Sequence, residues 1–314
     1  MREVKKIVIA GAGTMGISLV QIFAKFDFAV TLYNRSQPSL EKAKKLIDIN
    51  QQGLILQGMT TAEKSAEAVN KIEFTCNKDC FKDADYVIEN IVENMDAKHD
   101  FWREISSIAP KDAVLTTNTS GMSITSIAEA VERPERFACM HFWNPPHLVP
   151  LVEIIKGEKT CDEAVKVIYY VTEKVNMKPV VLQKEIQGFI GNRLQFAVLR
   201  EAMHIVESGV ATYQDVDKAM RFGLGFRYAC IGPFETADLG GLDTFANITS
   251  YLFKDLSNAQ DSVALKELVA DGNLGVKTGK GFYDYSDGKD EQAIRNRDES
   301  FIKLYKSLYG EQGE

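Results

Sequence analysis

The stretch KIVIAGAGTMG, residues 6–16, decides the fold. Its first half is an apolar, β-branched run, typical of a buried parallel strand. A G-x-G-x-x-G turn follows at once and opens a helical pattern from Ile17 to Phe28, which is the context that makes this motif informative. Gly11 permits the tight turn, Gly13 lets the backbone approach a pyrophosphate, and Gly16 allows helix and strand to pack closely. We expect a dinucleotide site lined by Gly11, Gly13, Thr14, Met15 and Gly16.

The second apolar strand, residues 29–33, ends at Asn34. NAD-binding proteins commonly carry an acidic residue at this point, which holds the ribose hydroxyl. Arg35 follows, and a guanidinium here can pair with the 2′-phosphate of NADP. Alternatively, Asn34 hydrogen-bonds the ribose of NAD and Arg35 stays in solvent. The sequence therefore allows either NAD(H) or NADP(H) as the cofactor and slightly favours NADP(H).

Short apolar strands alternate with helical stretches along the first half of the chain. Strands are expected at 72–74, 86–88, 113–117 and 137–141, helices at 97–108 and 124–131, and a helical pair broken near Gly53 and Gly58 at 38–70. Strands that alternate with helices predict a parallel sheet covered on both faces. The fold class is therefore α/β, with a Rossmann-type doubly wound parallel sheet.

The pattern changes near residue 184. From Gly188 to Tyr251 the periodicity is helical, with turns at 208–209 and 240–241. With 314 residues the chain is too long for one ordinary core. We expect a dinucleotide-binding domain at 1–184 and an all-helical C-terminal domain at 185–314.

The composition is that of a soluble globular protein, 45% hydrophobic and 26% charged. A formal net charge of −7 argues against nucleic acid as the main partner. The chain lacks an 18-residue apolar run and an N-terminal secretory signal, and its five cysteines lack metal-ligand spacing. We expect a cytoplasmic protein with ordinary thiols, a small-molecule substrate, and no membrane or metal.

Two residues point to acid–base chemistry. His141 closes an apolar strand, and prolines soon force the chain to leave that strand. Glu153 lies in the aliphatic run LVEII, where a buried carboxylate is costly unless another group pairs with it. Each could be a structural residue by itself. Beside a dinucleotide site, the pair predicts a histidine base for a secondary alcohol and a carboxylate that fixes its tautomer.

Hydroxyl and amide groups cluster at the end of another strand, in TTNTS at 116–120. They can hold a substrate oxygen or cap the helix that begins near Ile124. For Ser123 and Thr125, capping is the expected role.

In order along the chain, several motifs resemble those of 3-hydroxyacyl-CoA dehydrogenases. They are the glycine turn, ENIVEN at 89–94, NTS at 118–120, HFWNP at 141–145, LVE at 151–153, GFIGNR at 188–193, GPFE at 232–235 and GKGFY at 279–283. The resemblance covers roughly residues 5–286 and implies a Rossmann domain joined to a helical domain that pairs in a homodimer. It also implies short-chain 3-hydroxyacyl-CoA oxidation, as in fatty acid metabolism.

The resemblance assigns a role to each matching position. His141 is the base and Glu153 its partner, while Ser120 and Asn144 contact the substrate's 3-oxygen region or support the histidine. Residues beside the cofactor are Glu93, Lys98 and Asn118, and Asn192 lies near the substrate.

Three departures qualify this reading. Asn34 replaces the usual acidic residue, and Gly121 stands where a serine is common. Residues 192–195 and 227–233 are closer to the branch of lambda-crystallin, L-gulonate 3-dehydrogenase and carnitine dehydrogenase. In that branch Arg227 could hold a free carboxylate, or it could form an ordinary ion pair. The segment 49–57 also lacks the positive charge expected of a CoA-binding arm. The alternatives are a free 3-hydroxy-acid dehydrogenase and a non-catalytic dinucleotide-binding protein like a lens crystallin.

Overall fold

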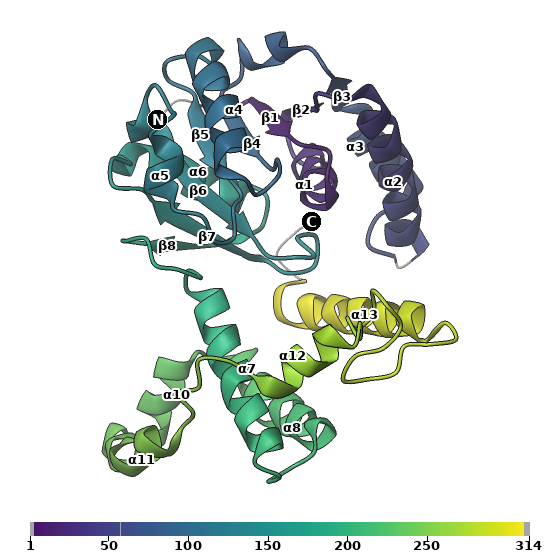
Figure 1. The fold of residues 1–314 in the computed structure, drawn as a ribbon. Coiled ribbons are helices and arrows are strands. Elements are labelled where there is room, and N and C mark those ends of the chain that lie inside the picture. Colours follow the sequence, from purple (N-terminus) through teal and green to yellow (C-terminus); the bar gives the residue numbers. More distant parts are fainter. Residues whose placement is uncertain (1–2, 57, 311–314) are drawn as a thin grey trace. The chain divides into compact units, whose positions relative to one another are not determined.

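A computed structural model describes residues 3–56 and 58–310. The chain divides into two compact units, Met1–Gly191 and Asn192–Glu314, each of which is described by itself (Figure 1). This division lies after the 184/185 boundary expected from the sequence. Residues just beyond 184 belong to unit 1 because Glu185 and Ile190 hydrogen-bond to groups in it.

Unit 1 is built on one eight-stranded sheet with the order β3-β2-β1-β4-β5-β6-β7-β8. The strands are β1 (Lys6–Ala10), β2 (Ala29–Tyr33), β3 (Ile72–Thr75), β4 (Tyr86–Glu89), β5 (Val114–Thr117), β6 (Phe137–Phe142), β7 (Leu151–Lys156) and β8 (Lys178–Leu182). Neighbouring strands are parallel from β3 to β6. The predicted α/β class with a Rossmann-type sheet is confirmed.

The last two strands correct the expectation of a wholly parallel sheet. β7 pairs antiparallel to β6, and β8 is parallel to β7. Only residues 143–150 connect β6 to β7. A parallel neighbour needs a crossover of a dozen or more residues, so this short connection returns the chain in the opposite direction.

Helices cover both faces of the sheet. They are α1 (Thr14–Ala24), α2 (Gln37–Leu56), α3 (Ala62–Asn70), η1 (Lys78–Phe81), α4 (Met95–Ile108), α5 (Ile124–Ala128), η2 (Pro134–Arg136) and α6 (Asp162–Lys174). One apolar cluster joins the sheet to α1, α2 and α6, and a second joins it to α4 and α5. Side chains alternate along a strand, so the buried strands contribute side chains to both clusters. This agrees with their near-continuous apolar sequences.

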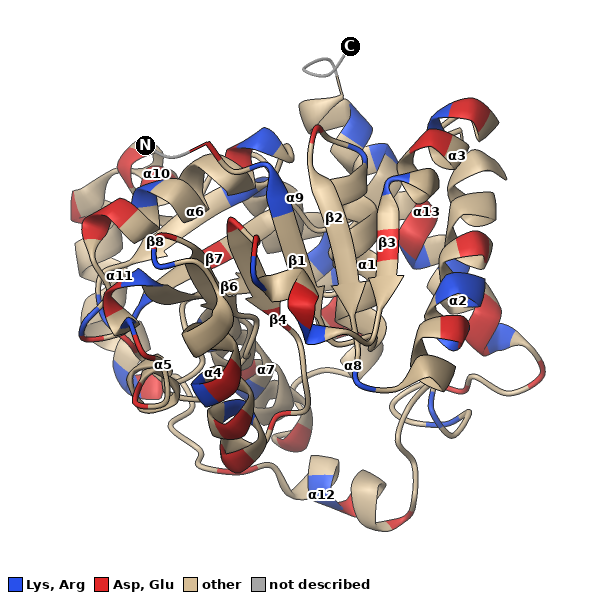
Figure 2. Cartoon of the chain, turned by 90° about the horizontal axis from the view of Figure 1, so that it is seen from above, with Lys and Arg blue, Asp and Glu red and all other residues tan. Residues whose placement is uncertain are grey.

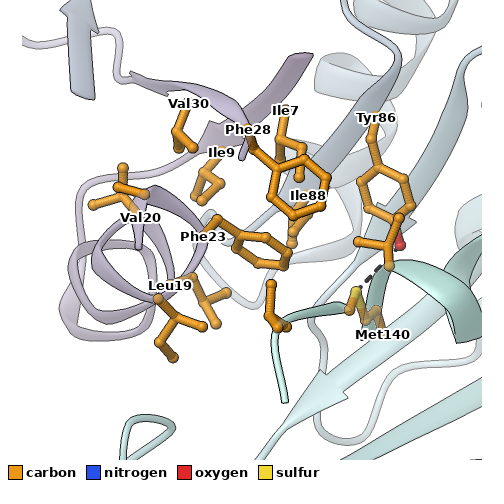
Figure 3. Close-up of a cluster of buried hydrophobic side chains, with 14 of the residues drawn as sticks. Ile7, Ile9, Leu19, Val20, Phe23, Phe28, Val30, Tyr86, Ile88 and Met140 are labelled. Carbon is orange, nitrogen blue, oxygen red and sulfur yellow. Dashed lines mark hydrogen bonds between the residues drawn. The ribbon is translucent and has the colours of Figure 1, made fainter. Parts of the chain in front are cut away.

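Figure 3 shows the first cluster, where Phe23 of α1 packs among side chains of β1, β2 and β4. Phe23 and Phe28 meet edge to face with ring centroids 6.0 Å apart. The Tyr86 hydroxyl donates to Met140 Sδ at 3.1 Å, which satisfies the polar atom at the edge of the cluster. α1 ends at Ala24, before the predicted Phe28, because residues 25–28 turn the chain into β2.

The helical pair at 38–70 breaks at Gly58, as expected, but the predicted break at Gly53 is wrong. α2 runs through Gly53 to Leu56. A glycine inside a helix costs about 1 kcal/mol, and tertiary contacts outweigh it here. Gln51 of α2 bonds Gln21 of α1 at 2.8 Å in a buried setting, and Leu54 is also buried. Gln57 lies outside the described residues.

Unit 2 is helical. Its elements are α7 (Gly191–Glu207), α8 (Tyr213–Ala219), the π-helix η3 (Met220–Leu224), α9 (Gly225–Tyr228), α10 (Pro233–Gly240), α11 (Leu242–Asp255), α12 (Val263–Ala270) and α13 (Lys289–Tyr309). The first residue of α7, Gly191, is also the last residue of unit 1. The predicted turns near 209 and 241 are confirmed, with positive φ at Gly209 and Gly241. Among the described residues, none of the helices is long and apolar enough to cross a membrane.

Candidate active site

The glycine turn after β1 is shaped by two close backbone contacts and one open position. Gly11 has φ +110°, and a Cβ there would lie 2.5 Å from the Asn90 carbonyl oxygen. A Cβ on Gly16 would lie 1.9 Å from the Gly11 carbonyl oxygen. At Gly13 an added Cβ would meet nothing within 4 Å, and no side chain caps the helix there. The N-terminus of α1 is thus open at Gly13, where a bound pyrophosphate would accept its N–H groups.

The other two residues expected at this turn take different places. Thr14 is exposed at the first position of α1, and its carbonyl accepts a bond from Ser18. Met15 is half-buried and packs against the core below the turn. Only Thr14 presents its side chain to solvent beside the open N-terminus.

The end of β2 holds the residues that would meet the adenosine ribose. The Asn34 backbone N–H donates to the Thr75 carbonyl at 3.2 Å, and its side-chain Nδ2 donates to the Ser36 carbonyl at 3.3 Å. Arg35 is exposed. This arrangement orients the Asn34 amide and leaves the guanidinium of Arg35 in solvent.

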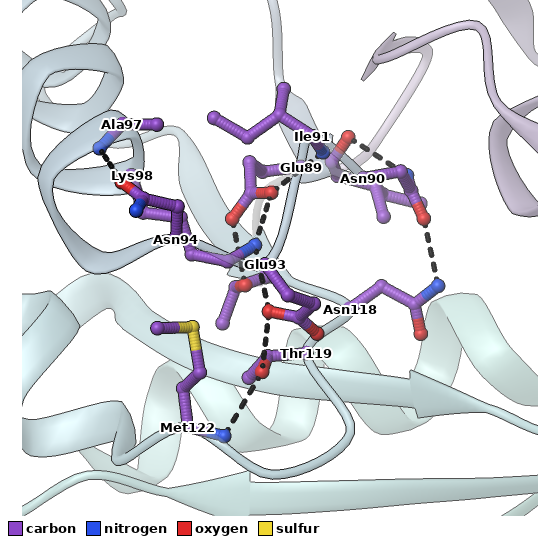
Figure 4. A network of polar contacts seen from close by, with 12 residues as sticks. Glu89, Asn90, Ile91, Glu93, Asn94, Ala97, Lys98, Asn118, Thr119 and Met122 are labelled. Atoms are coloured by element: carbon purple, nitrogen blue, oxygen red, sulfur yellow. Dashed lines mark hydrogen bonds and ion pairs between the residues drawn. The ribbon is translucent and has the colours of Figure 1, made fainter. Parts of the chain in front are cut away.

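A buried ion pair lies at the end of β4 (Figure 4). Lys98 of α4 has a side chain only 1% exposed, and its Nζ lies 2.6 Å from Glu89 Oε1 and 3.5 Å from Glu93 Oε2. Glu89 also accepts from Thr117 Oγ1 at 2.7 Å and from the Ile91 N–H at 2.8 Å. These bonds offset the cost of burying the charges and fix the loop after β4.

Sequence reasoning assigned no role of its own to Glu89, and it considered Thr117 only as a member of the TTNTS cluster. Both end apolar strands, and a polar residue at that point of a parallel sheet is a signal that could have found them. The register places Glu89 beside Thr117, and Thr117 beside Cys139. Burial raises the pKa of the Cys139 thiol well above its usual range, so this group is neutral.

Asn118 joins three strand ends. Its Oδ1 accepts from the Phe142 N–H at 2.9 Å, and its Nδ2 donates to Asn90 Oδ1 at 2.7 Å. Next to it, Thr119 Oγ1 donates to Glu93 Oε2 at 3.1 Å. Asn118 therefore ties the loops after β4 and β5 to β6.

Ser120 and Asn144 are both exposed. The Ser120 backbone N–H donates to Glu93 Oε1 at 3.2 Å, so its loop is anchored to that carboxylate. Ser123 caps α5, as expected, by accepting from the Ser126 N–H. Thr125 instead donates to Glu185, which also accepts the N–H groups at the start of α5.

His141 and Glu153 are brought together by the β6–β7 pairing. His141 Nδ1 lies 2.8 Å from Glu153 Oε2, and both side chains are almost fully buried. His141 follows Phe137 and Cys139 on the face that α4 and α5 cover. The ring of Phe189 meets the imidazole edge to face at 5.3 Å.

Glu153 accepts more than the histidine. Within the described residues, its Oε2 also accepts from Trp143 Nε1 at 3.2 Å, and its Oε1 accepts from the N–H groups of Ile190 at 2.8 Å and Gly191 at 3.0 Å. Burial by itself would raise the pKa of Glu153, but these bonds outweigh it and hold the pKa below its ordinary value. The carboxylate is therefore ionised, so His141 donates through Nδ1 and Nε2 remains as its basic nitrogen.

Asn192 is the second residue of α7 and the first of unit 2. Its substrate role stays a prediction. Gly121 is exposed, with open space around an added Cβ.

Family models match nearly the whole chain. The model of the 3-hydroxyacyl-CoA dehydrogenase NAD-binding domain matches residues 6–186, and that of the 3-hydroxyacyl-CoA dehydrogenase C-terminal domain matches residues 188–285. The chain belongs to the 3-hydroxyacyl-CoA dehydrogenase family. It is accordingly an oxidoreductase of the NAD-dependent dehydrogenase type.

Relatives in the family differ in what they act on. The 5-formyl-3-hydroxy-2-methylpyridine 4-carboxylate 5-dehydrogenase of Mesorhizobium japonicum is 33% identical over 309 residues, covering 98% of this chain and 99% of that protein. The 3-hydroxybutyryl-CoA dehydrogenase of Clostridioides difficile is 34% identical over 283 residues, covering 90% of this chain and 99% of that protein.

Among solved structures, a 5-formyl-3-hydroxy-2-methylpyridine 4-carboxylic acid 5-dehydrogenase, described as an NAD⁺-dependent dismutase, matches with a TM-score of 0.89. It is 32% identical, with 98% of this chain and 99% of that chain covered. The family comparisons support NAD(H) as the cofactor. They do not support the lean to NADP(H) that Asn34 and Arg35 suggested.

Proposed function

We propose that this family member interconverts a 3-hydroxyacyl compound and its 3-oxoacyl counterpart, with His141 as general base and acid and NAD(H) as cofactor. The observation that carries the proposal is the His141–Glu153 pair, 2.8 Å apart and buried at the end of β6. Histidine exchanges protons near neutral pH, which suits the removal of a hydroxyl proton from a secondary alcohol.

Different residues of the chain would carry out the proton transfer, the substrate binding and the cofactor binding. Glu153 accepts from Nδ1 and stabilises the imidazolium that forms when Nε2 takes the substrate proton. Exposed Ser120 and Asn144 can hydrogen-bond the substrate oxygen. When bound, the nicotinamide ring supplies the hydride acceptor. The open turn at Gly13 fits a pyrophosphate, and Asn34 fits the ribose.

NAD(H) is supported by the family's NAD-binding domain model. Asn34 can hold a ribose hydroxyl through its amide, and Arg35 then plays no part. We accordingly take NAD(H) and not NADP(H) as the cofactor of this site.

The first substrate candidate is a short-chain CoA thioester such as 3-hydroxybutyryl-CoA. Relatives bearing that activity in their names support it, with identities of 33–34% over about nine-tenths of this chain. The first half of α2 carries lysines among acidic residues, visible as blue and red bands in Figure 2. In the family such a lysine-bearing arm meets the nucleotide end of CoA.

The second candidate is a small free carboxylic acid. The solved structure of a pyridine-carboxylate dehydrogenase matches this chain with a TM-score of 0.89, against 0.76 for the 3-hydroxybutyryl-CoA dehydrogenase of Escherichia coli. The second half of α2, residues 49–56, also carries no charged side chain to meet the phosphates of CoA. Both observations favour a substrate smaller than a CoA thioester.

Parallel assays separate the candidates. Acetoacetyl-CoA and free acetoacetate would be supplied with NADH, and their 3-hydroxy counterparts with NAD⁺. The aldehyde 5-formyl-3-hydroxy-2-methylpyridine 4-carboxylate would be supplied with NAD⁺, which its oxidation requires. Turnover of the thioester alone supports the first candidate, and turnover of a free acid alone supports the second. If purified, folded protein turns over none of these compounds while it still binds NADH, the proposed 3-hydroxyacyl chemistry is wrong.

A further inference from the structure

Trp143 lies two residues beyond His141, at the end of β6. Its indole Nε1 donates to Glu153 Oε2 at 3.2 Å, and the same oxygen accepts from His141 Nδ1. We propose that Trp143 is a positioning residue of the catalytic pair: its N–H shares Glu153 Oε2 with the histidine and thereby sets how firmly the carboxylate holds the histidine's proton. This inference rests on the proposed role of His141 as the base.

The indole is held in place by the chain that joins the two units. A Cβ on Gly191 would lie 2.2 Å from Cζ2 of Trp143, so only glycine allows the backbone to approach this closely. The same Gly191 donates its N–H to Glu153 Oε1. One short segment thus lies against the indole and also donates to the carboxylate.

The direction of the effect follows from the charge on Glu153. Each donor to the carboxylate stabilises the ionised form and reduces its basicity. Without the indole N–H, Oε2 becomes a stronger base and attracts the imidazolium proton more firmly. The neutral histidine that the oxidation needs would then form only at higher pH. Removing the carboxylate charge itself has the opposite effect, because it leaves the imidazolium without its partner.

Other titratable groups near β6 do not reproduce this effect. The Cys139 thiol on β6 is neutral because burial raises its pKa. Lys98 is paired with Glu89 and Glu93, and Lys156 at the end of β7 is paired with Asp162 at 2.6 Å. Lys178 on β8 has its own partner.

The chain offers a matched control, because it contains only two tryptophans. Trp102 of α4 is fully buried, and its Nε1 has no hydrogen-bond partner among the described residues. W143F and W102F therefore make the same chemical change, but only W143F removes a bond to Glu153. The pH dependence of kcat/KM would be measured for wild type, W143F, W102F and E153Q, with the Kd for NADH as a second readout.

For W143F we expect the acidic limb of the profile to move up by about 0.5–1 pH unit. This is about half of the 1–2 units to which one hydrogen bond to a charged group corresponds, because the indole acts on the histidine only through Glu153. Its kcat/KM then falls about three- to tenfold near pH 6 and recovers to within about twofold near pH 9. W102F keeps the wild-type midpoint, E153Q moves the limb down, and the Kd for NADH is unchanged in W143F. A W143F profile that superimposes on wild type, or an equal shift in W102F, overturns the proposal.

Two measurements on the protein without substrate test the proposal independently of which substrate the enzyme turns over. The His141 Cε1–H resonance, identified by its loss in H141Q, should titrate with a higher midpoint in W143F. In W102F, Trp143 is the sole tryptophan, and its emission should change with the same midpoint as that resonance. Flat emission across this range overturns the proposal, even if W143F fails to fold. By contrast, an H141Q variant that remains active contradicts the proposed base and leaves these titrations unaffected.

Discussion

His141 and Glu153 stand directly opposite one another in the antiparallel β6–β7 ladder, and their side chains meet at 2.8 Å. The pairing is therefore set by the backbone register of two strands and not by a flexible loop. Residues directly opposite on one face of an antiparallel pair have Cβ atoms about 4.5–5.5 Å apart. The imidazole and the carboxylate need only ordinary rotamers to reach each other, and the pair is preorganised.

The first prediction concerns the base. H141Q keeps a side chain of similar size but cannot accept the substrate proton. We expect kcat to fall by about 10²–10⁴-fold, the usual scale of general-base catalysis. The Kd for NADH should stay within about twofold of wild type. The matched control is H147Q, a histidine exposed on the connection after β6. Near-normal turnover by H141Q would remove His141 from the mechanism.

The second prediction concerns stability and pH. E153Q places an amide NH₂ among donors that need an acceptor, so we expect it to unfold more easily by about 1–3 kcal/mol at neutral pH. The folded-state pKa of Glu153 is held below its ordinary value of about 4.3. Its ionisation therefore stabilises the fold fully above about pH 5 and loses this contribution as the pH falls through the folded-state pKa.

Urea unfolding of wild type and E153Q at several pH values measures this difference. We expect the gap between the two proteins to be largest at neutral pH and to narrow in acid. A gap that stays constant down to about pH 3 would show that the charge of Glu153 does not contribute.

The third prediction concerns the buried pair of Lys98 and Glu89. K98M leaves the Glu89 carboxylate buried without its cation, so we expect a loss of about 3–5 kcal/mol. The double variant E89Q/K98M removes both charges and should be more stable than K98M. The control is K78M, which breaks an exposed ion pair with Glu104 and should cost less than about 1 kcal/mol. Equal losses in K98M and K78M would contradict the structural role of this pair.

The fourth prediction concerns cofactor choice. Wild type should bind NADH more tightly than NADPH, and N34D should widen this difference by about tenfold, because a carboxylate repels the 2′-phosphate. R35A should leave the Kd for NADH within about twofold. R103A, which changes an exposed arginine on α4, serves as the control. If wild type binds NADH and NADPH with equal affinity, and R35A weakens the binding of NADPH alone, the preference for NADP(H) suggested by the sequence would be supported instead.

The fifth prediction concerns association. Unit 2 exposes many large apolar side chains, among them Phe222, Phe226, Phe234, Leu239 and Phe253. Apolar surface on this scale marks an interaction site, and most oligomers of one chain are twofold dimers. We expect light scattering to give about 70 kDa, twice the 35.1 kDa chain. A mass near that of one chain at all working concentrations would exclude the homodimer.

Much of the fold could be predicted because its signals are local. The apolar run at β1, the glycine turn and the helical period of α1 lie next to one another in the sequence, and each has a direct physical reading. The sequence-based prediction failed where a contact with a residue distant in the sequence decides the local structure. α2 continues through Gly53 because Gln51 packs against Gln21 of another helix, and glycine's local preference is too weak to oppose that contact.

The candidate site divides in the same way. His141 and Glu153 were visible because each is a charged or titratable group in an apolar run. The contacts of Glu89, Thr117 and Trp143 were not, since each of these residues lies at a strand end and its neighbours depend on how the sheet and helices pack. Only the packed structure shows that Glu89 of β4 reaches Lys98 of α4 and that Trp143 shares an oxygen of Glu153 with the histidine.

The sequence by itself therefore determined the α/β class, the place of the dinucleotide turn and the two residues proposed for acid–base chemistry. These features follow from residue type and from the spacing of apolar residues, which repeats every two residues in a strand and every 3.6 in a helix. Such patterns can be recognised without knowing which elements pack together. The tertiary structure alone decided the direction of β7, the saturation of Glu153 by donors from β6 and the start of α7, and the buried network around Lys98. The first two depend on which strands pair and on contacts between residues far apart in the chain, and the third depends on how α4 packs against the end of β4.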